Sequence, residues 1–411
     1  MPSATYRTLL RIPGAVAFFL TATTGRLGIA MTSLGIIWLV HGRTGSYATA
    51  GLVTGAFAVA EALAGPQLAR LTDRFGQTRV LPPVLLAHAG AVTSLLALVE
   101  SGSPHALPTA AGALAGATIP QLGALSSARW SALLRGERAE ALPTAFALES
   151  LGNGLCYLTG PALVTAVAAS GDPAHGMVLA TSLVVGGGLA LAAQGRTAPA
   201  TTADATRRRR AGRSLLRPGF AVQVGVNLVL GLHFGAMQVS VTAFAAQHGA
   251  ADAAAPLYAV SNCAGLLAGW LYGLRRWRGA PRAQLSIASA WLALNCLPLF
   301  VADSIPVMGL VLAVTGLAIP PILVLSSVLT TAAVDRAALT QAFTWLNSAS
   351  AAGSAGAAAL SGRAVDVYGA NGGFAIASAA TATMAALAAA HARAAWGRRT
   401  GSGLPPHRPM R

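Results

Sequence analysis

The 411-residue chain alternates between long apolar stretches and short polar gaps. Most stretches reach the roughly 20 residues that an α-helix needs to cross the hydrocarbon core of a bilayer. The pattern therefore predicts an all-α polytopic membrane protein. Breaks at polar, Pro and Gly positions predict twelve transmembrane helices near residues 14 to 40, 47 to 68, 80 to 99, 106 to 128, 142 to 168, 174 to 194, 218 to 244, 254 to 274, 283 to 302, 305 to 329, 339 to 361 and 370 to 392.

The arginines predict the orientation of these helices. The sequence has 28 Arg and no Lys, and 25 of the Arg fall before the first stretch, after the last, or in alternate gaps between them. The fourth gap, for example, contributes Arg129, Arg135 and Arg138. Because basic loops stay on the cytoplasmic side, these gaps and both termini are predicted to be cytoplasmic. The other gaps hold Arg43, Arg363, Glu100, Asp172, Asp252, Asp303 and Asp366.

Composition agrees with a membrane protein. Hydrophobic residues make up 54% of the chain, charged residues 10%, and the mean hydropathy is +0.60. The net charge of +16 is spread over separate gaps, where it suits anionic lipid headgroups better than nucleic acid. Arginine and alanine without lysine are typical of a high-GC bacterial genome, so we expect a multi-pass protein of the bacterial cytoplasmic membrane.

The longest polar stretch divides the chain near its midpoint. We predict an N-terminal six-helix half at 1–196, a flexible, arginine-rich cytoplasmic linker at 197–217, a C-terminal six-helix half at 218–396 and a cytoplasmic tail at 397–411. A shift of 200 residues aligns Ile119-Pro120 with Ile319-Pro320 and Leu125-Ser126-Ser127 with Leu325-Ser326-Ser327. A second match pairs Ala145-Phe146 with Ala342-Phe343. The repeat predicts a pseudo-two-fold relation between the halves.

Residues 69–79, in the second gap, carry a family resemblance. Leu71, Asp73, Arg74 and Gly76 match the Gly-x-Leu-Ala-Asp-Arg-x-Gly-Arg-Lys/Arg pattern of the major facilitator superfamily, and Arg79 supplies one later basic residue. The chain thus resembles a twelve-helix transporter of that superfamily. Residues 269–275 repeat the spacing of this motif in the second half, with Gly273 at the position of the Asp.

The resemblance implies a gating role for this motif. Leu71, Asp73, Arg74, Gly76 and Arg79 are the predicted gating residues. In the family the Asp caps an interface between the halves, so Asp73 is expected to act as a charge latch on the cytoplasmic side. The alternative is a plain tight turn formed by residues 73–76.

Three charged residues fall inside the predicted spans. A charge at the centre of the bilayer costs about 2.5–3.5 kcal/mol on insertion scales, so such residues normally face a protein interior or a wet cavity and find partners. Arg26, Glu61 and Glu149 are therefore the candidates for proton coupling or for a charge pair. We expect Glu149 to carry the proton or to be a static partner of Arg26. Glu61 either belongs to the site or reaches the cytoplasmic interface by snorkelling.

Further site residues follow from polarity and from the resemblance. Asn153 lies one turn after Glu149, and family members line their cavity with spans one, four, seven and ten. The predicted substrate cavity comprises Arg26, Gln121, Asn153, Asn227, Gln238 and Thr315. Gly160-Pro161 weakly resembles the span-five signature of drug:proton antiporters, and residues 149–161 together with 344–347 resemble exporters of actinobacterial type. The alternative reading of Gly160-Pro161 is a helix kink or a close helix contact.

The function predicted from these features is secondary active transport by alternating access. We expect proton-coupled export of a small amphipathic organic molecule or drug by a monomer. An importer or facilitator of a small solute is the alternative, and a membrane-embedded enzyme or non-transporting sensor the distant one. Gly353-Ser354 is superficially similar to a serine-hydrolase motif but suits helix packing better. We predict no catalytic residues, no metal site and no cofactor.

Overall fold

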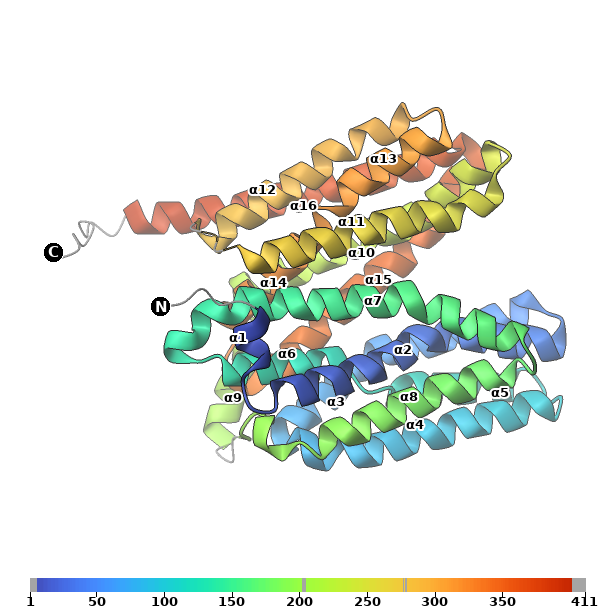
Figure 1. Ribbon diagram of the computed structural model, residues 1–411, viewed down its shortest axis with the longest axis horizontal. Coiled ribbons are helices and arrows are strands. Elements are labelled where there is room, and N and C mark those ends of the chain that lie inside the picture. The colour runs from blue at the N-terminus through green and yellow to red at the C-terminus, as the bar shows by residue number, and fades with distance from the viewer. Residues whose placement is uncertain (1–5, 202–204, 276, 278, 401–411) are drawn as a thin grey trace.

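The computed structural model describes residues 6–201, 205–275, 277 and 279–400. Within these ranges every regular element is a helix. Figure 1 shows two bundles side by side, one from each half of the chain. The first contains α1 (Tyr6–Leu10), α2 (Ala15–Thr44), α3 (Tyr47–Phe75), α4 (Gln77–Glu100), α5 (Ala106–Thr118), α6 (Leu122–Leu133), α7 (Leu142–Ala169) and α8 (Ala174–Ala192). The second contains α10 (Pro218–Gln247), α11 (Ala254–Leu274), α12 (Pro281–Asn295), α13 (Ile305–Gly316), α14 (Ile319–Ala333), α15 (Leu339–Tyr368) and α16 (Ala370–Thr400).

The predicted fold class is confirmed. Ten helical segments of the described chain are long and apolar enough to cross a membrane. The other two predicted spans correspond to the broken pair α5 and α6 and to α15, which is rich in small polar residues. Each predicted stretch thus coincides with one helix or with one interrupted helix.

The repeated Ile-Pro pair marks a helix break in each half. Pro120 lies between α5 and α6, and Pro320 lies in the first turn of α14, directly after α13 has ended. Proline lacks a backbone N–H and its ring clashes with the preceding turn, so it interrupts a helix at the same depth in both halves. The repeat seen in the sequence is therefore a repeat of local structure.

The predicted linker is partly helical rather than a flexible coil. Helix α9 (Ala205–Ser214) forms within it, and Ala211 of this helix is buried. The backbone N–H of Asp335 donates a hydrogen bond of 2.9 Å to the Ser214 hydroxyl, which holds α9 against the C-terminal half. Residues 202–204 of the linker and 401–411 of the predicted tail lie outside the described residues, as do Arg276 and Arg278.

Glycines allow the closest helix contacts. A Cβ on Gly28 of α2 would lie 2.4 Å from the Ala180 carbonyl oxygen of α8, and one on Gly235 of α10 would lie 2.0 Å from the Ser354 carbonyl oxygen of α15. Gly353 meets the Leu228 backbone in the same way. The Gly353-Ser354 segment is thus a packing surface, because small residues let membrane helices approach closely.

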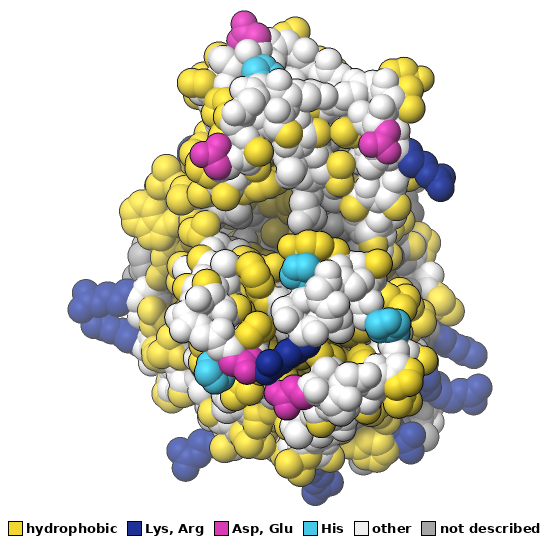
Figure 2. All heavy atoms as spheres, turned by 90° about the vertical axis from the view of Figure 1, so that its right-hand side faces the viewer, with side chains coloured by type: hydrophobic (Ala, Val, Ile, Leu, Met, Phe, Trp, Pro, Cys, Tyr) yellow, Lys and Arg dark blue, Asp and Glu magenta, His cyan; other side chains and the backbone are white. Residues whose placement is uncertain are grey.

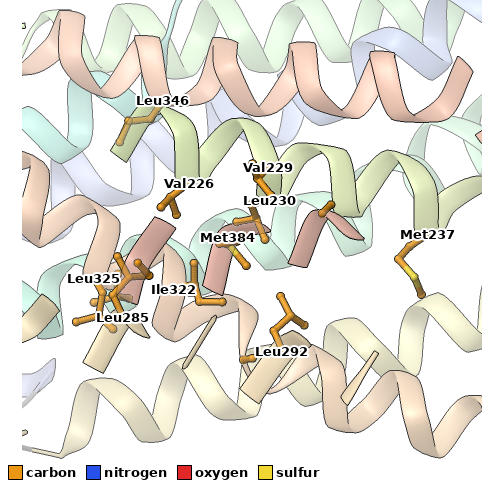
Figure 3. Packing of buried hydrophobic residues seen from close by; sticks show 14 of the residues in the cluster. Val226, Val229, Leu230, Met237, Leu285, Leu292, Ile322, Leu325, Leu346 and Met384 are labelled. Atoms are coloured by element: carbon orange, nitrogen blue, oxygen red, sulfur yellow. The ribbon is translucent and has the colours of Figure 1, made fainter. Parts of the chain in front are cut away.

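The larger apolar core lies in the C-terminal bundle. Most of its members come from helices α10 to α16, with a few from α6, α7 and α9, and Figure 3 shows Val226, Leu230, Leu292, Ile322 and Met384 among them. Three further clusters fill the N-terminal bundle. Each half therefore has an apolar interior of its own, on which a polar site between the halves can be built.

The two ends of the molecule differ in charge. Both termini lie at one end in Figure 1, which we call the basic end because it carries exposed Arg74 and Arg135. The opposite, acidic end carries Glu100 and Asp172. There Arg43 pairs with Asp172 and lies 3.7 Å from Glu100. Ala174 donates its backbone N–H to Asp172, and this hydrogen bond, with the nearby Arg43, lowers the pKa of that carboxyl.

Candidate functional site

Arg26 and Glu149 form a buried ion pair in the N-terminal half. Nη1 of Arg26, on α2, lies 2.6 Å from Oε2 of Glu149, on α7, and each residue is only 6% exposed. The other guanidinium nitrogen, Nη2, donates to the Thr23 hydroxyl at 3.0 Å, one turn earlier on α2. The two opposite charges, which lie on different helices, thus meet inside the bundle, as charges inside a membrane usually do.

Glu149 also accepts hydrogen bonds from two side chains of α6. Ser126 Oγ lies 2.5 Å and Trp130 Nε1 lies 2.8 Å from its Oε1 oxygen. Both carboxylate oxygens of Glu149 therefore accept hydrogen bonds from neighbouring side chains. Ser126 and Trp130 were not predicted from the sequence as partners of Glu149. The one feature of the sequence that could have indicated them is their four-residue spacing, which places both side chains on one face of a helix.

Glu61 has a different environment. It lies 14 residues from each end of α3, about 21 Å along the helix axis at 1.5 Å per residue. Because α3 continues beyond residue 68 to Phe75, Glu61 lies at the middle of this helix, and its snorkelling to the interface stays a prediction. Glu61 is half-buried, and its one described hydrogen bond is a 3.3 Å contact from Gln121 Nε2. Among the described residues, no basic side chain pairs with it.

Glu61 lies on the face of α3 that turns toward the C-terminal half. Gly65 follows it by one turn, and a Cβ on Gly65 would meet Thr344 of α15 at 3.3 Å and the Gln121 side chain at 3.4 Å. Residues four apart share one face of a helix. Glu61 therefore lies one turn before the point where the two halves touch, on the side of the acidic end.

The prediction that Arg129 lies in a cytoplasmic gap between helices is wrong. The residue was counted among the basic residues of the fourth gap, but α6 extends to Leu133 and Arg129 is fully buried. Its guanidinium donates to the Gln77 side chain, the Thr197 hydroxyl and the carbonyls of Leu191 and Gln194. It therefore holds α6 against the ends of α4 and α8 and does not face lipid headgroups.

The motif at residues 69–79 forms both a turn and a contact between the halves. Gly76 ends α3 with φ of +93°, a conformation that glycine adopts without strain. Asp73 Oδ2 accepts a 3.0 Å hydrogen bond from the backbone N–H of Gln341, in the first turn of α15. A carboxylate at a helix N-terminus satisfies a free N–H and interacts favourably with the helix dipole. Arg74 stacks on Phe75, while Leu71 and Arg79 are exposed.

A second contact at the basic end mirrors the Asp73 contact. The Thr144 hydroxyl, at the start of α7, donates to the Gly273 carbonyl at the end of α11 at 3.0 Å. Next to it, the rings of Phe146 and Phe343 lie 5.7 Å apart. These two residues are the Ala-Phe repeat partners, so they meet where the pseudo-two-fold axis passes between the halves. The halves are therefore packed together at the basic end.

The acidic end is open. Figure 2 views the molecule from this end and shows the surface hollowed between the two halves, with hydrophobic side chains around the hollow. Closure at one end and a hollow at the other are the geometry of one access state of a two-half transporter.

The predicted cavity residues separate into two groups. Gln121 and Asn153 are half-buried and Gln238 is exposed. Arg26 is buried in its ion pair, and Asn227 and Thr315 are buried in the C-terminal half. Asn227 donates to Ser326 Oγ at 2.7 Å, so it joins α10 to α14. In this state these three residues therefore stabilise helix packing rather than line an open surface.

Gly160 lies at a close helix contact. Helix α7 continues through Gly160-Pro161, and a Cβ on Gly160 would lie 3.0 Å from Ala30 Cβ of α2. Small residues at such contacts allow membrane helices to approach closely. A kink or an antiporter signature at this pair stays a prediction.

Solved structures show the same fold. The chain is similar to the human organic anion transporter MFSD10 (TETRAN), with 16% identity and a TM-score of 0.66, over 94% of this chain and 100% of that one. It is similar to a bacterial homologue of the iron transporter ferroportin in an outward-facing state, with 12% identity and a TM-score of 0.70, over 91% and 98%. It is also similar to the transporter FucP in the outward conformation, with 15% identity and a TM-score of 0.67, over 92% and 98%.

No curated protein sequence is significantly similar to the chain. The Major Facilitator Superfamily model, in contrast, matches residues 15–358, which include most of both helical bundles. With the paired bundles, the Asp73 contact and the opening between the halves, this match shows that the chain belongs to the Major Facilitator Superfamily and is a multi-pass membrane transporter rather than an enzyme.

Proposed function

We propose that this transporter exports a small amphipathic organic molecule in exchange for protons, across a bacterial cytoplasmic membrane with both termini in the cytoplasm. With the basic end in the cytoplasm, as the arginine distribution favours, the hollow of Figure 2 opens outward. The apolar surroundings of the hollow suit an amphipathic substrate. The observation that carries the proposal is the carboxyl of Glu61, which has no basic partner among the described residues and lies at the middle of α3, beside the contact between the halves.

The two acids in the N-terminal half have different roles in this proposal. Proton uptake by Glu149 has to compete with Arg26, Ser126 and Trp130, all of which donate to its oxygens. Glu61 has a single weak donor, so a proton readily relieves the cost of a charge at this depth. We therefore assign proton exchange to Glu61, and we assign to the Arg26–Glu149 pair the support of α2 against α7.

Alternating access then couples the outward flux of substrate to the inward flux of protons. Glu61 takes a proton from outside while the hollow is open and releases it after the halves have rocked to open the basic end. Substrate that binds in the hollow beside Glu61 favours the ionised form of its carboxyl, so substrate and proton occupy the site in turn. The antiport direction follows from this competition.

The test uses inside-out vesicles with an acidic lumen and a pH-sensitive dye. Amphipathic compounds are added singly, and we expect at least one to collapse the pH gradient in wild-type vesicles but not in Glu61→Gln vesicles. Glu100→Gln, which neutralises an acid at the acidic end, is the matched control and should behave as wild type.

Each other outcome rejects part of the proposal. Gradient collapse by Glu61→Gln vesicles at the wild-type rate would reject Glu61 as the exchange group. Compound exchange that is indifferent to the gradient would favour a facilitator, and absence of any flux from reconstituted protein would favour a sensor.

A further inference from the structure

The repeated gating motif is asymmetric between the halves. In the first half Asp73 reaches the start of α15 with a carboxylate. At the equivalent position of the second half Gly273 reaches the start of α7 only through its backbone carbonyl, which accepts from Thr144. The second contact therefore lacks a side chain on the α11 side.

Tyr6 of α1 fills the place of the missing side chain. A Cβ on Gly273 would lie 2.0 Å from the Tyr6 hydroxyl oxygen and 2.8 Å from Ala147 Cβ, so no other residue fits there without displacement. The Tyr6 hydroxyl donates to the carbonyl oxygens of Gly269 at 3.2 Å and Trp270 at 3.1 Å. Its ring is thus seated in a notch on the last turn of α11 that exists because residue 273 is glycine.

Helix α1 bridges the two halves through two side chains. Leu9 is 2% exposed and belongs to an apolar cluster of the N-terminal half. Tyr6, one turn earlier, packs against the core cluster that lies mainly in the C-terminal half. Because Leu9 anchors α1 to the N-terminal bundle, separation of the halves at the basic end has to pull Tyr6 out of the Gly273 notch.

The hydroxyl of Tyr6 remains a donor at physiological pH. Burial raises its pKa to about 12, and a protonated phenol keeps its hydrogen bond to the α11 carbonyls. The contact therefore depends on the position of the halves and not on the pH gradient.

We propose that Tyr6 is a gating residue, which docks into the Gly273 notch in this state and leaves it whenever the basic end opens. It supplies in the second half the closing contact that Asp73 supplies in the first. The contact of Tyr6 with α11 thus sets the ratio of the two access states. This role depends on neither the substrate, the coupling ion nor the transport direction.

The test measures the two access states directly. Pairs of spin labels at Thr78 and Ala280, on the basic end, and at Ser101 and Ala251, on the acidic end, are introduced into full-length protein whose three native cysteines have been replaced. Distance distributions are recorded by double electron–electron resonance in lipid nanodiscs without substrate. All four positions are exposed and lie outside the contacts between the halves.

Tyr6→Phe removes only the hydroxyl and should leave the melting temperature nearly unchanged. We expect it to raise the ratio of basic-end-open to basic-end-closed molecules by roughly two- to tenfold, the effect of one lost hydrogen bond. The distance at the acidic end should shorten in the same fraction of molecules. Gly273→Ala should shift the ratio further, and adding Tyr6→Ala to it should have little extra effect because both changes remove one contact.

Two control variants separate gating from general disturbance. Leu10→Ala removes an exposed side chain of the same helix, and Gly90→Ala adds a methyl group where no atom lies within 4 Å. Both should keep the wild-type ratio. An unchanged ratio in Tyr6→Phe and Tyr6→Ala would overturn the proposal, and so would an equal shift in Leu10→Ala. Failure of proton-driven export would leave these distances unaffected.

Discussion

Removal of one member of the Arg26–Glu149 pair should destabilise the protein strongly. Glu149→Gln keeps the size of the side chain but leaves the guanidinium of Arg26 without an opposite charge at 6% exposure. Breaking a buried ion pair in this way costs about 3–5 kcal/mol, because the remaining charge stays desolvated. The carboxamide also offers one acceptor oxygen where Arg26, Ser126 and Trp130 now donate to two. We therefore expect the upper part of that range.

The double variant decides whether the two charges act as a pair. If the losses in Arg26→Gln and Glu149→Gln were independent, their sum would be about 6–10 kcal/mol. Residues in direct contact show coupling free energies of up to about 3 kcal/mol, so the double variant should be less destabilised than that sum by about this amount.

Unfolding in mixed micelles with increasing denaturing detergent, followed by tryptophan fluorescence, measures the free energy of unfolding of all four proteins. The Arg43 and Asp172 pair at the acidic end is the matched control, because each of its side chains is more than one-third exposed. Its charge-neutralising variants should change stability little, since exposed ion pairs gain little over solvated charges. Additive losses at Arg26 and Glu149, or a loss below about 1 kcal/mol in Glu149→Gln, would refute the reasoning.

Three further predictions concern topology, gating and packing. A single cysteine at Ser103 should react with an impermeant thiol reagent from outside intact cells and one at Thr78 should not; the reverse pattern would refute the proposed orientation. Asp73→Asn keeps an acceptor oxygen but loses the charge at the α15 N-terminus, so it should move the access-state ratio by roughly two- to fivefold toward opening of the basic end. A loss of folded protein in step with activity would instead indicate a purely structural turn. Gly235→Ala, whose Cβ would lie 2.0 Å from a backbone oxygen, should cost about 1–3 kcal/mol of unfolding free energy, whereas Gly356→Ala, with open space around it, should be neutral.

The sequence alone was sufficient for the fold class, the positions of the helices and the repeat. These features depend on local chemistry: a bilayer requires long apolar helices, and the apolar stretches and polar gaps that specify them can be read directly from the sequence. The Ile-Pro pairs predicted that the two halves are related, whereas the helix breaks that they mark before Leu122 and at the start of α14 became visible only in the structure. Arg26 and Glu149 could also be identified from sequence, because a charge inside an apolar span needs a partner.

Sequence reasoning failed where an outcome depends on which elements meet. Arg129 looked like a loop arginine, because nothing in the sequence shows that the ends of α4 and α8 supply the acceptors that bury it. From the sequence Glu61 was placed near the end of its span, because the polar end of α3 reads as a loop although it remains helical to Phe75.

The contacts between the halves could be found only from the tertiary structure. Asp73 was expected at an interface by resemblance, but its partner, the N–H of Gln341, lies 268 positions away in the chain. Tyr6 gave no signal, since an aromatic residue near a terminus is ordinary, and its role depends on the missing side chain of Gly273 on a distant helix. Local sequence determines what each segment can form. The complementarity of distant surfaces, which no local pattern encodes, decides where those segments make the site.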